Sequence, residues 1–374
     1  MLNPSDIPSM FGRHTVSFTL VAVLGLYFLY MAMGVTSGHS ALWSQPRLDP
    51  TPVSPSLLTA MQQALSERRM DVVRFLLRQV TPEGMSSTGV AHNVSISVPV
   101  LPPDHHKRNW SHPAMKQGSL AQPGFRFDGV CGESGYKCVV SYGLYGGNPK
   151  YTEGAIQNAQ IISEIYPGWV MRVYHDASVP SDILRRLREM KVELTSVGSE
   201  VQGGDIAGMF WRFLIAEDTS VDRYLVRDSD SRLNVREKHA VEEWMESGYS
   251  IHSLRDHPNH DRPLNGGMWG GVKGAVKNIR SMVSLHSRHG YGADLDFLNH
   301  KVWPSVKEDQ LSHDSYSCTK YVNAHPFPTR RPDNLQHCGQ VYENNLPRMS
   351  DITCCLIGNH NPPACRGKPN WEYG

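Results

Sequence analysis

Short apolar runs alternate with helical patterns between residues 138 and 226 of this 374-residue chain. Pro167 and Gly168, which interrupt both helices and strands, separate one helical pattern from the next apolar run. Such alternation is typical of βαβ units, so the sequence predicts an α/β fold whose mostly parallel sheet is flanked by helices. We expect strands at residues 138–144, 169–174, 192–195 and 223–226, and helices at residues 151–166, 181–190 and 208–216.

Composition leaves room for a sizeable core and argues against nucleic acid as the main partner. Apolar residues make up 40% of the chain and charged residues 20%, and 37 basic residues nearly balance 36 acidic ones. A domain that binds nucleic acid usually carries a net basic face. A small polar substrate remains open.

Residues 15–35 carry no formal charge and are rich in leucine, valine and phenylalanine. A helix of this length spans a bilayer of about 30 Å, whereas the apolar part of a cleaved signal peptide is only about 7–15 residues long. We therefore predict a cytoplasmic tail at residues 1–14 and an uncleaved, single-pass membrane anchor at residues 15–35. The glycosylation sequons at Asn93 and Asn109 favour a lumenal C-terminal part and a type II protein of the Golgi or another secretory membrane.

Residues 36–128 are rich in Pro, Ser and His and indicate a stem, followed by a main domain at residues 129–374. Within the stem, residues 56–80 show the spacing of one amphipathic helix. This helix either packs on the main domain or lets the stem form a homodimer.

The seven cysteines gather at the two edges of the main domain. Disulfides at both edges suit an oxidising lumen, although the sequence does not give the connectivity. Because seven is odd, at least one thiol is free or pairs with another chain. The cysteines are Cys131, Cys138, Cys318, Cys338, Cys354, Cys355 and Cys365.

Two acidic residues, Asp228 and Asp230, follow the strand predicted at residues 223–226. Ligands of open α/β sheets bind beyond the carboxyl ends of strands. Carboxylates one residue apart can converge on Mg²⁺ or Mn²⁺, hard cations that take oxygen ligands and are completed by phosphates. A turn that uses Asp and Ser for capping is the alternative.

Three arginines lie near this acidic pair in the sequence: Arg212, Arg227 and Arg232. Guanidinium groups bind phosphate oxygens in a bidentate manner, so we expect these residues to contact a phosphate. A surface salt bridge is the alternative for each of them.

A glycine-rich segment at residues 264–271 reads as a turn pressed close to a ligand, in which Trp269 offers an apolar face to a sugar or a base. A core tryptophan in a plain turn is the alternative. Asp256, Asp294 and His313 add further groups with acid, base or metal chemistry. For Asp294, as for Asp309, capping of a helix competes with a functional role.

Taken together, residues 138–340 resemble nucleotide-sugar glycosyltransferases of the GT-A fold, including Golgi type II membrane enzymes. The resemblance is carried by the Arg212 helix, the Asp228-Ser-Asp230 motif, the Asn265-Gly-Gly turn and the acidic segment from Asp294. It implies a Mn²⁺ or Mg²⁺ cofactor, a nucleotide-sugar donor, and a glycan or other hydroxyl acceptor.

The resemblance also implies roles for single residues. Arg212 would hold the nucleotide or its phosphates, Asp228 would face ribose and metal, and Asp230 would ligate the metal. Asn265, Gly266, Gly267 and Asp294 would hold the sugar, and His313 or His325 would complete the metal site. Leu295 stands where the family has Gln.

The stereochemistry stays open at this point. An inverting enzyme needs a carboxylate base, for which Asp256 is the candidate, whereas a retaining enzyme can dispense with one.

Two other functions compete. Phosphatases of the haloacid dehalogenase type also place Asp-x-Asp after a strand, but at the start of the domain and followed by small residues, whereas Ser231 and Arg232 follow here. A membrane-anchored lectin would keep the fold without catalysis.

Overall fold

The computed structural model describes residues 129–356 and residue 365, except residues 134, 198–206, 287–289, 319, 322–323 and 333–335. The predicted tail, membrane anchor and stem lie outside the described residues. Within the described part, none of the helices has the length and apolar character needed to cross a bilayer.

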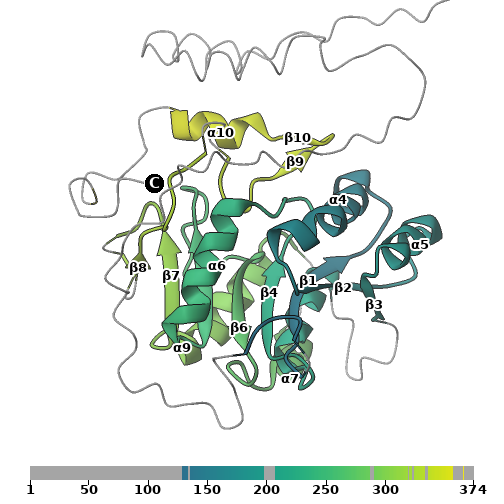
Figure 1. Ribbon diagram of the computed structural model, residues 1–374, viewed down its shortest axis with the longest axis horizontal. Helices are drawn as coiled ribbons and strands as arrows, with labels where there is room; N and C mark the ends of the chain where they lie inside the picture. Colours follow the sequence, from purple (N-terminus) through teal and green to yellow (C-terminus); the bar gives the residue numbers. More distant parts are fainter. Residues whose placement is uncertain are drawn as a thin grey trace, which may run out of the picture. The chain divides into compact units, whose positions relative to one another are not determined.

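A single eight-stranded sheet forms the centre of the domain, with the strand order β3-β2-β1-β4-β6-β5-β7-β8 (Figure 1). Only β6 runs antiparallel to its neighbours β4 and β5, and the other pairs are parallel. The α/β fold with a mostly parallel sheet is therefore confirmed. The strands are β1 Cys138–Leu144, β2 Val170–His175, β3 Glu193–Ser196, β4 Arg223–Arg227, β5 Ile251–Arg255, β6 Met268–Val272, β7 Gln310–Asp314 and β8 Ala324–His325.

Helices cover both faces of this sheet. One apolar layer joins it to α4 Pro149–Ile165, α5 Ser181–Glu189 and α6 Val235–Ser247. The other joins it to η2 Gly208–Glu217, α7 Ile279–His286, α8 Ala293–Phe297 and the π-helix η3 Leu298–Val302. The described part also contains α9 Trp303–Val306, the hairpin of β9 Tyr342–Glu343 with β10 Leu346–Pro347, and α10 Met349–Leu356.

Strand β1 shows why the sheet needs two covers. Val140 and Tyr142 point to the layer of α4, whereas Val139 points to the layer of η2, and all three are fully buried. Successive side chains of a strand face opposite sides, so the alternating apolar residues of β1 need cover on both faces of the sheet.

Two segments differ from our sequence predictions. Residues 208–216, expected as an ordinary helix, form the 3-10 helix η2, in which every side chain from Phe210 to Ala216 is buried. The segment at 264–271, expected as a turn, enters strand β6 at Met268. A Cβ at Gly270 would lie 2.5 Å from the Tyr224 carbonyl, so this glycine serves close contact with β4 and not contact with a ligand.

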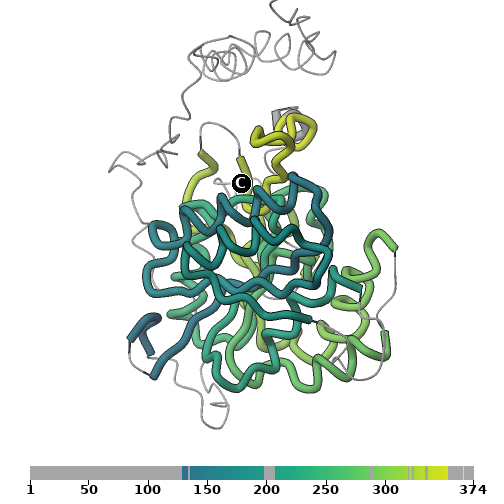
Figure 2. The backbone as a smooth tube through the Cα atoms, turned by 90° about the vertical axis from the view of Figure 1, so that its right-hand side faces the viewer, coloured from purple at the N-terminus to yellow at the C-terminus, as the bar shows by residue number. Residues whose placement is uncertain are grey.

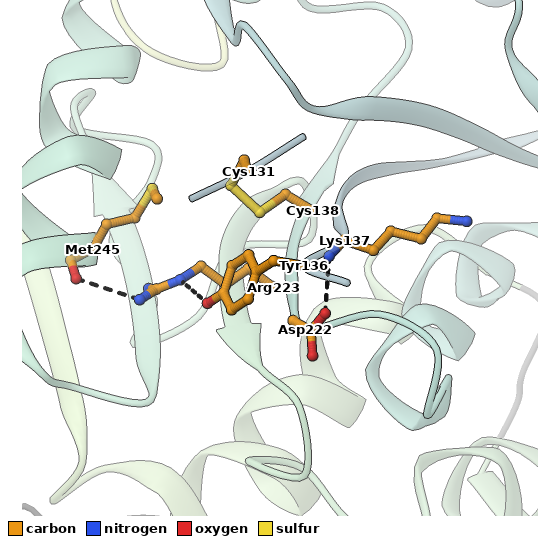
Figure 3. Close-up of a disulfide and its surroundings, with 7 residues drawn as sticks. All are labelled: Cys131, Tyr136, Lys137, Cys138, Asp222, Arg223 and Met245. Atoms are coloured by element: carbon orange, nitrogen blue, oxygen red, sulfur yellow. Dashed lines mark hydrogen bonds between the residues drawn. A yellow bond between two sulfur atoms is a disulfide. The ribbon is translucent and has the colours of Figure 1, made fainter. Parts of the chain in front are cut away.

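A disulfide between Cys131 and Cys138 ties the chain before the sheet to the first residue of β1 (Figure 3). Beside it, Arg223 Nε donates a 2.8 Å hydrogen bond to the Tyr136 hydroxyl, and the Lys137 amide donates to the Asp222 carboxylate at 2.8 Å. These contacts fix where β1 and β4 begin.

A second disulfide joins Cys318 to Cys365, and Cys338 is a buried free thiol. The structure thus contains a disulfide at each edge of the domain, as expected. The side chains of Cys354 and Cys355 lie outside the described residues.

Candidate active site

The loop after β4 carries Asp228 and Asp230, and it packs against helix α4. A Cβ at Gly154 would lie 2.0 Å from the Ser229 carbonyl oxygen, so only glycine lets the helix come this close. The Asn158 side chain donates to the Ser231 carbonyl at 2.8 Å and accepts from the Leu233 amide at 3.1 Å. Helix α4 therefore fixes the shape of the acidic loop.

The β9–β10 hairpin holds the same loop from another side. The Tyr342 amide donates to the Asp230 carbonyl at 2.8 Å, and Ser231 forms an isolated bridge with Val341. Figures 1 and 2 show this hairpin in yellow beside α4, which it contacts.

Helix α4 itself starts directly after β1, at the same edge of the sheet. The Asn148 side chain caps it by accepting from the Lys150 amide at 3.0 Å, and Pro149 supplies the first helical residue. This start brings the Lys150 ammonium to 3.0 Å from Asp230 Oδ2.

The Arg212 guanidinium is the centre of the site. Its Nη1 lies 3.1 Å from Asp228 Oδ1, and its Nη2 lies 2.7 Å from Asp294 Oδ2. Its Nε donates to the Gly266 carbonyl at 3.3 Å. One side chain therefore joins η2, the loop after β4, the turn before β6, and α8.

The glycine turn packs directly on this arrangement. A Cβ at Gly266 would lie 2.7 Å from Arg212 Nη2 and 2.8 Å from Asp294 Oδ2. A Cβ at Gly267 would lie 2.1 Å from Asp228 Oδ2. The sequence analysis expected the backbone of this turn to lie close to a ligand. In the structure it lies close to the charged side chains of Arg212, Asp294 and Asp228.

Burial and charge act together on Asp230. Burial raises the pKa of its carboxyl group most, the negative charge of Asp228 raises it further, and Lys150 and Arg212 lower it. The Asp228 side chain is 41% exposed, and that of Asp230 is 14% exposed. Two carboxylates that repel each other at an accessible strand end fit a hard divalent cation, because the cation would relieve the repulsion.

Arg212 stays fully charged in this setting. Burial lowers the pKa of its guanidinium, but Asp228 and Asp294 outweigh the burial and raise the pKa overall. The arginine is therefore a fixed positive charge between carboxylates.

Asp294 does not cap a helix, which was the alternative to a functional role. Helix α8 begins after Gly292, which adopts a left-handed conformation with φ of 83°, and no side chain caps that end. The Asp294 carboxylate binds Arg212 instead. Asp309 accepts the Ser250 amide at 3.1 Å and so positions the start of β5.

Asn265 is adjacent to the site but does not point into it. Its side-chain amide donates to the carbonyl groups of Leu254, His260 and Arg262 at 3.0–3.4 Å. Asn265 therefore shapes the turn that carries the glycines.

Trp269 and Arg227, which we expected at the ligand, lie in the interior. Trp269 is fully buried, and its ring packs on Phe213 and Tyr224 with centroids 5.9 Å and 5.7 Å away. Arg227 is 1% exposed, and its Nε lies 2.7 Å from Glu237 Oε1. Both assignments are corrected, because the last residues of β4 and the first of β6 pair inside the sheet.

Arg232 supports the acidic loop from outside. Its Nε donates to Gln157 at 2.6 Å, and its guanidinium lies 4.7 Å from the centroid of the Tyr342 ring. The structure thus gives Arg232 partners in α4 and the β9–β10 hairpin.

Asp256, the candidate base, is fully buried and has both carboxylate oxygens engaged. Arg236 and Arg331 each approach it to 2.9 Å, and the Cys338 amide donates to it at 2.9 Å. Burial raises the pKa of Asp256, but the two arginines outweigh it and hold the pKa far below the usual value. The expectation of a base at this position is corrected, since Asp256 cannot meet a substrate hydroxyl.

His313 is not brought to the acidic pair. Strands β6 and β5 lie between β4 and β7 in the sheet. The His313 ring is fully buried and binds Glu243 through Nε2 at 2.8 Å and His252 through Nδ1 at 2.8 Å. His325 lies with it, so neither histidine completes a metal site at Asp228 and Asp230, and this expectation is corrected as well.

Sequence reasoning missed Lys150 and the α4 residues that clamp the loop. A signal was present, because the Gly146-Gly-Asn-Pro turn follows β1 just as the acidic motif follows β4. Carboxyl ends of neighbouring parallel strands share one edge of the sheet. The same rule that selected Asp228 thus also points to Lys150.

No family model and no curated protein matches the chain. Among solved structures, it is similar to a glycosyltransferase involved in glycosylation of the major capsid of PBCV-1, with TM-score 0.33 and 15% identity, over 48% of this chain and 81% of that one. It is also similar to Mycobacterium tuberculosis glucosyl-3-phosphoglycerate synthase in complex with Mn²⁺ and UDP-glucose, with TM-score 0.32 and 18% identity, over 52% and 76%.

A third similar structure is the 4-diphosphocytidyl-2C-methyl-D-erythritol synthase of Anaerococcus prevotii, with TM-score 0.32 and 12% identity, over 51% of this chain and 91% of that one. TM-scores and identities this low carry no argument about activity. The function must therefore be argued from the residues of the site.

Proposed function

We propose that this domain is a metal-dependent glycosyltransferase that moves a sugar from a nucleotide-sugar donor to a hydroxyl group of a glycan or another acceptor. The proposal depends on one observation. Arg212 joins Asp228 and Asp294 beside the Gly266–Gly267 turn, at the strand end where open α/β sheets bind ligands.

Asp228 and Asp230 are the proposed ligands of Mn²⁺ or Mg²⁺. Both offer only oxygen atoms, which these cations prefer; Asp228 faces Arg212, and Asp230 faces Lys150 at the start of α4. When bound, the cation would neutralise charge on a diphosphate leaving group.

The protein's own cations complete the donor site in this proposal. Lys150 carries an ammonium group beside Asp230, where a diphosphate bound next to the carboxylates would meet it. Arg212 keeps Asp228 and Asp294 in fixed positions, because each nitrogen of its guanidinium has a different partner. The glycine turn carries no side chains at Gly266 and Gly267, which lets these charged groups pack directly on its backbone.

Asp294 is assigned as a positioning residue in this scheme. Its Oδ2 binds Arg212 at 2.7 Å and so sets the orientation of the guanidinium that faces Asp228. Because Asp256 is sealed in the interior, we assign no side chain as a base.

The setting in the cell is part of the proposal. A single-pass type II anchor at residues 15–35 would place the domain in the lumen of the Golgi or another secretory compartment, and the stem would allow homodimers. The apolar segment, the sequons at Asn93 and Asn109, and a domain with two disulfides support this setting.

The test uses the full chain in detergent with a panel of nucleotide sugars and Mn²⁺, with and without a chelator, and measures release of nucleoside diphosphate. We expect release from one donor, abolished by the chelator and reduced at least about 10³-fold in Asp230→Asn. The matched control is Asp296→Asn, because the Asp296 side chain is 62% exposed on α8 and should keep full activity.

Two outcomes contradict the proposal. Release of inorganic phosphate from simple monoesters would indicate a phosphatase. Glycan binding without turnover of any donor would indicate a lectin.

A further inference from the structure

A second cluster of metal-binding residue types lies away from Asp228 and Asp230. It consists of Glu243 on α6, His313 on β7 and His325 on β8, and one ligand atom from each lies within 4.8 Å of the others. Glu243 Oε2 is 2.8 Å from His313 Nε2, and Glu243 Oε1 is 3.0 Å from His325 Nε2.

The sheet places the two histidines by its register. His313 and His325 are direct partners on the neighbouring parallel strands β7 and β8, so their side chains point to the same face. Leu311, two residues before His313, packs in the apolar layer that contains Val241 and Trp244 of α6. That layer lies on the same face, so α6 delivers Glu243 onto both rings.

A third histidine fixes the orientation of His313. His252 on β5 places its Nε2 2.8 Å from His313 Nδ1, on the side away from Glu243. The His252 ring is stacked on Trp244, with centroids 5.4 Å apart and planes inclined by 8°. Histidines that bind metals usually have their other ring nitrogen hydrogen-bonded in this way, since the bond sets the tautomer and the direction of the ring.

The donor set selects the kind of cation. Two imidazole nitrogens and one carboxylate suit Zn²⁺, for which tetrahedral ligand bonds of about 2.0–2.2 Å place neighbouring ligand atoms roughly 3.4 Å apart, within the spacing of this cluster. Mg²⁺ prefers oxygen ligands and fits this cluster poorly. His313 is fully buried, whereas the side chains of Glu243 and His325 are 12% and 16% exposed, so an ion can reach the cluster from their side.

We infer that Glu243, His313 and His325 form a second divalent-metal site, which binds Zn²⁺ and is separate from the site at Asp228 and Asp230. The bound ion would join α6 to β7 and β8. Its role is to hold that edge of the sheet together, so the inference does not depend on the proposed transfer reaction.

The experiment must separate the two sites, so it uses the full chain with Asp228→Asn and Asp230→Asn together. After removal of bound metals, Zn²⁺ binding is measured by calorimetry and by metal analysis of the dialysed protein. We expect about one Zn²⁺ per chain, and affinity at least about 10-fold weaker when His325→Ala is added. His325 is the preferred target because it is partly exposed, so its loss disturbs packing less than loss of His313.

The control is His300→Ala in the same background, since His300 is exposed on η3 and belongs to neither site. A second measurement follows the midpoint of thermal unfolding, which Zn²⁺ should raise in the Asp228→Asn and Asp230→Asn background and not after His325→Ala. Absence of Zn²⁺ from the double variant, or equal binding after His325→Ala in a folded protein, would overturn the inference. In either case the cluster would be a hydrogen-bonded triad without a metal.

Discussion

Ionisable side chains converge at the acidic loop after β4 and at the Glu243–His313–His325 cluster, and the two regions are built differently. Asp228 and Asp230 lie beyond the end of their strand, and the Asp228 side chain is 41% exposed. His313 and His325 lie within their strands beneath α6, and His313 is fully buried. The first arrangement is partly open to solvent at Asp228, whereas the second is enclosed around His313.

The two regions also balance charge differently. At the acidic loop, carboxylates meet permanent cations, Arg212 and Lys150, so the charge is fixed by the protein. At the second cluster, one carboxylate meets two imidazoles, whose charge depends on protons or on a metal. Substitutions at the permanent cations should therefore affect turnover, and addition or removal of Zn²⁺ should act on the second cluster.

The largest expected effect comes from Arg212→Lys. Lysine keeps the charge but cannot bind Asp228, Asp294 and the Gly266 carbonyl from three nitrogens at once. We expect donor turnover to fall by about 10³-fold, equivalent to about 4 kcal/mol, measured as release of nucleoside diphosphate. Binding of Zn²⁺ at the second cluster should be unchanged.

The matched control for this change is Arg185→Lys. Arg185 is 62% exposed on α5 and pairs only with Glu189 on its own helix among the partners the structure describes. Turnover should stay within about 2-fold of the unsubstituted protein. Equal losses of turnover in both variants, or no loss of turnover in Arg212→Lys, would show that the contacts of Arg212 are not needed for turnover.

A smaller effect is expected from Gly267→Ala. The added methyl group would lie 2.1 Å from Asp228 Oδ2, so the carboxylate or the turn must move. We expect turnover to drop by about 10²-fold, equivalent to about 3 kcal/mol, with little change in the affinity of the second cluster for Zn²⁺.

Gly147→Ala provides the comparison for this variant. Its added methyl group would meet Pro180 at 3.4 Å, an ordinary contact. If Gly147→Ala and Gly267→Ala reduce turnover equally, loss of glycine flexibility and not the position of Asp228 is responsible.

The sequence located one of the two regions and not the other. A strand followed by an acidic motif is a local pattern, so the place of Asp228 and Asp230 is readable from residues 222–232. The contact between Arg212 and Asp294, which completes the site, is not local, because the two residues are 82 positions apart in the sequence. The sequence named both residues but gave no sign that they touch.

The same limit explains the residues that were misplaced. Trp269 and Arg227 look like ligand-binding groups in sequence, but the antiparallel pairing of β4 with β6 puts Val226 opposite Trp269 inside the sheet. His313 was assigned to the acidic pair because the resemblance implies a histidine that completes the metal site. Strands β6 and β5 lie between the acidic pair and His313. Strand order depends on long-range packing, which a short stretch of sequence does not reveal.

The smallest expected effect concerns the dependence of stability on pH through His260, a histidine outside both regions. His260, in the loop after β5, packs near the rings of His257 and His337 with centroids 5.7 Å and 5.4 Å away. Burial, followed by the charge of His257, lowers the pKa of His260 to about 3. The pKa in the unfolded chain is about 6.5, so between these values the unfolded chain binds a proton that the folded protein does not.

Folding stability from this residue is therefore complete above pH 6.5 and is lost as the pH falls toward 3. At pH 5.5 the loss is about 1 kcal/mol for His260 alone. Urea unfolding at pH 7.5 and 5.5 should show that the unsubstituted protein loses about 1 kcal/mol more than His260→Gln over this interval. His300→Gln, at an exposed position, should lose as much as the unsubstituted protein. If His260→Gln also loses as much, His260 is protonated in the folded state, and burial does not keep its ring neutral.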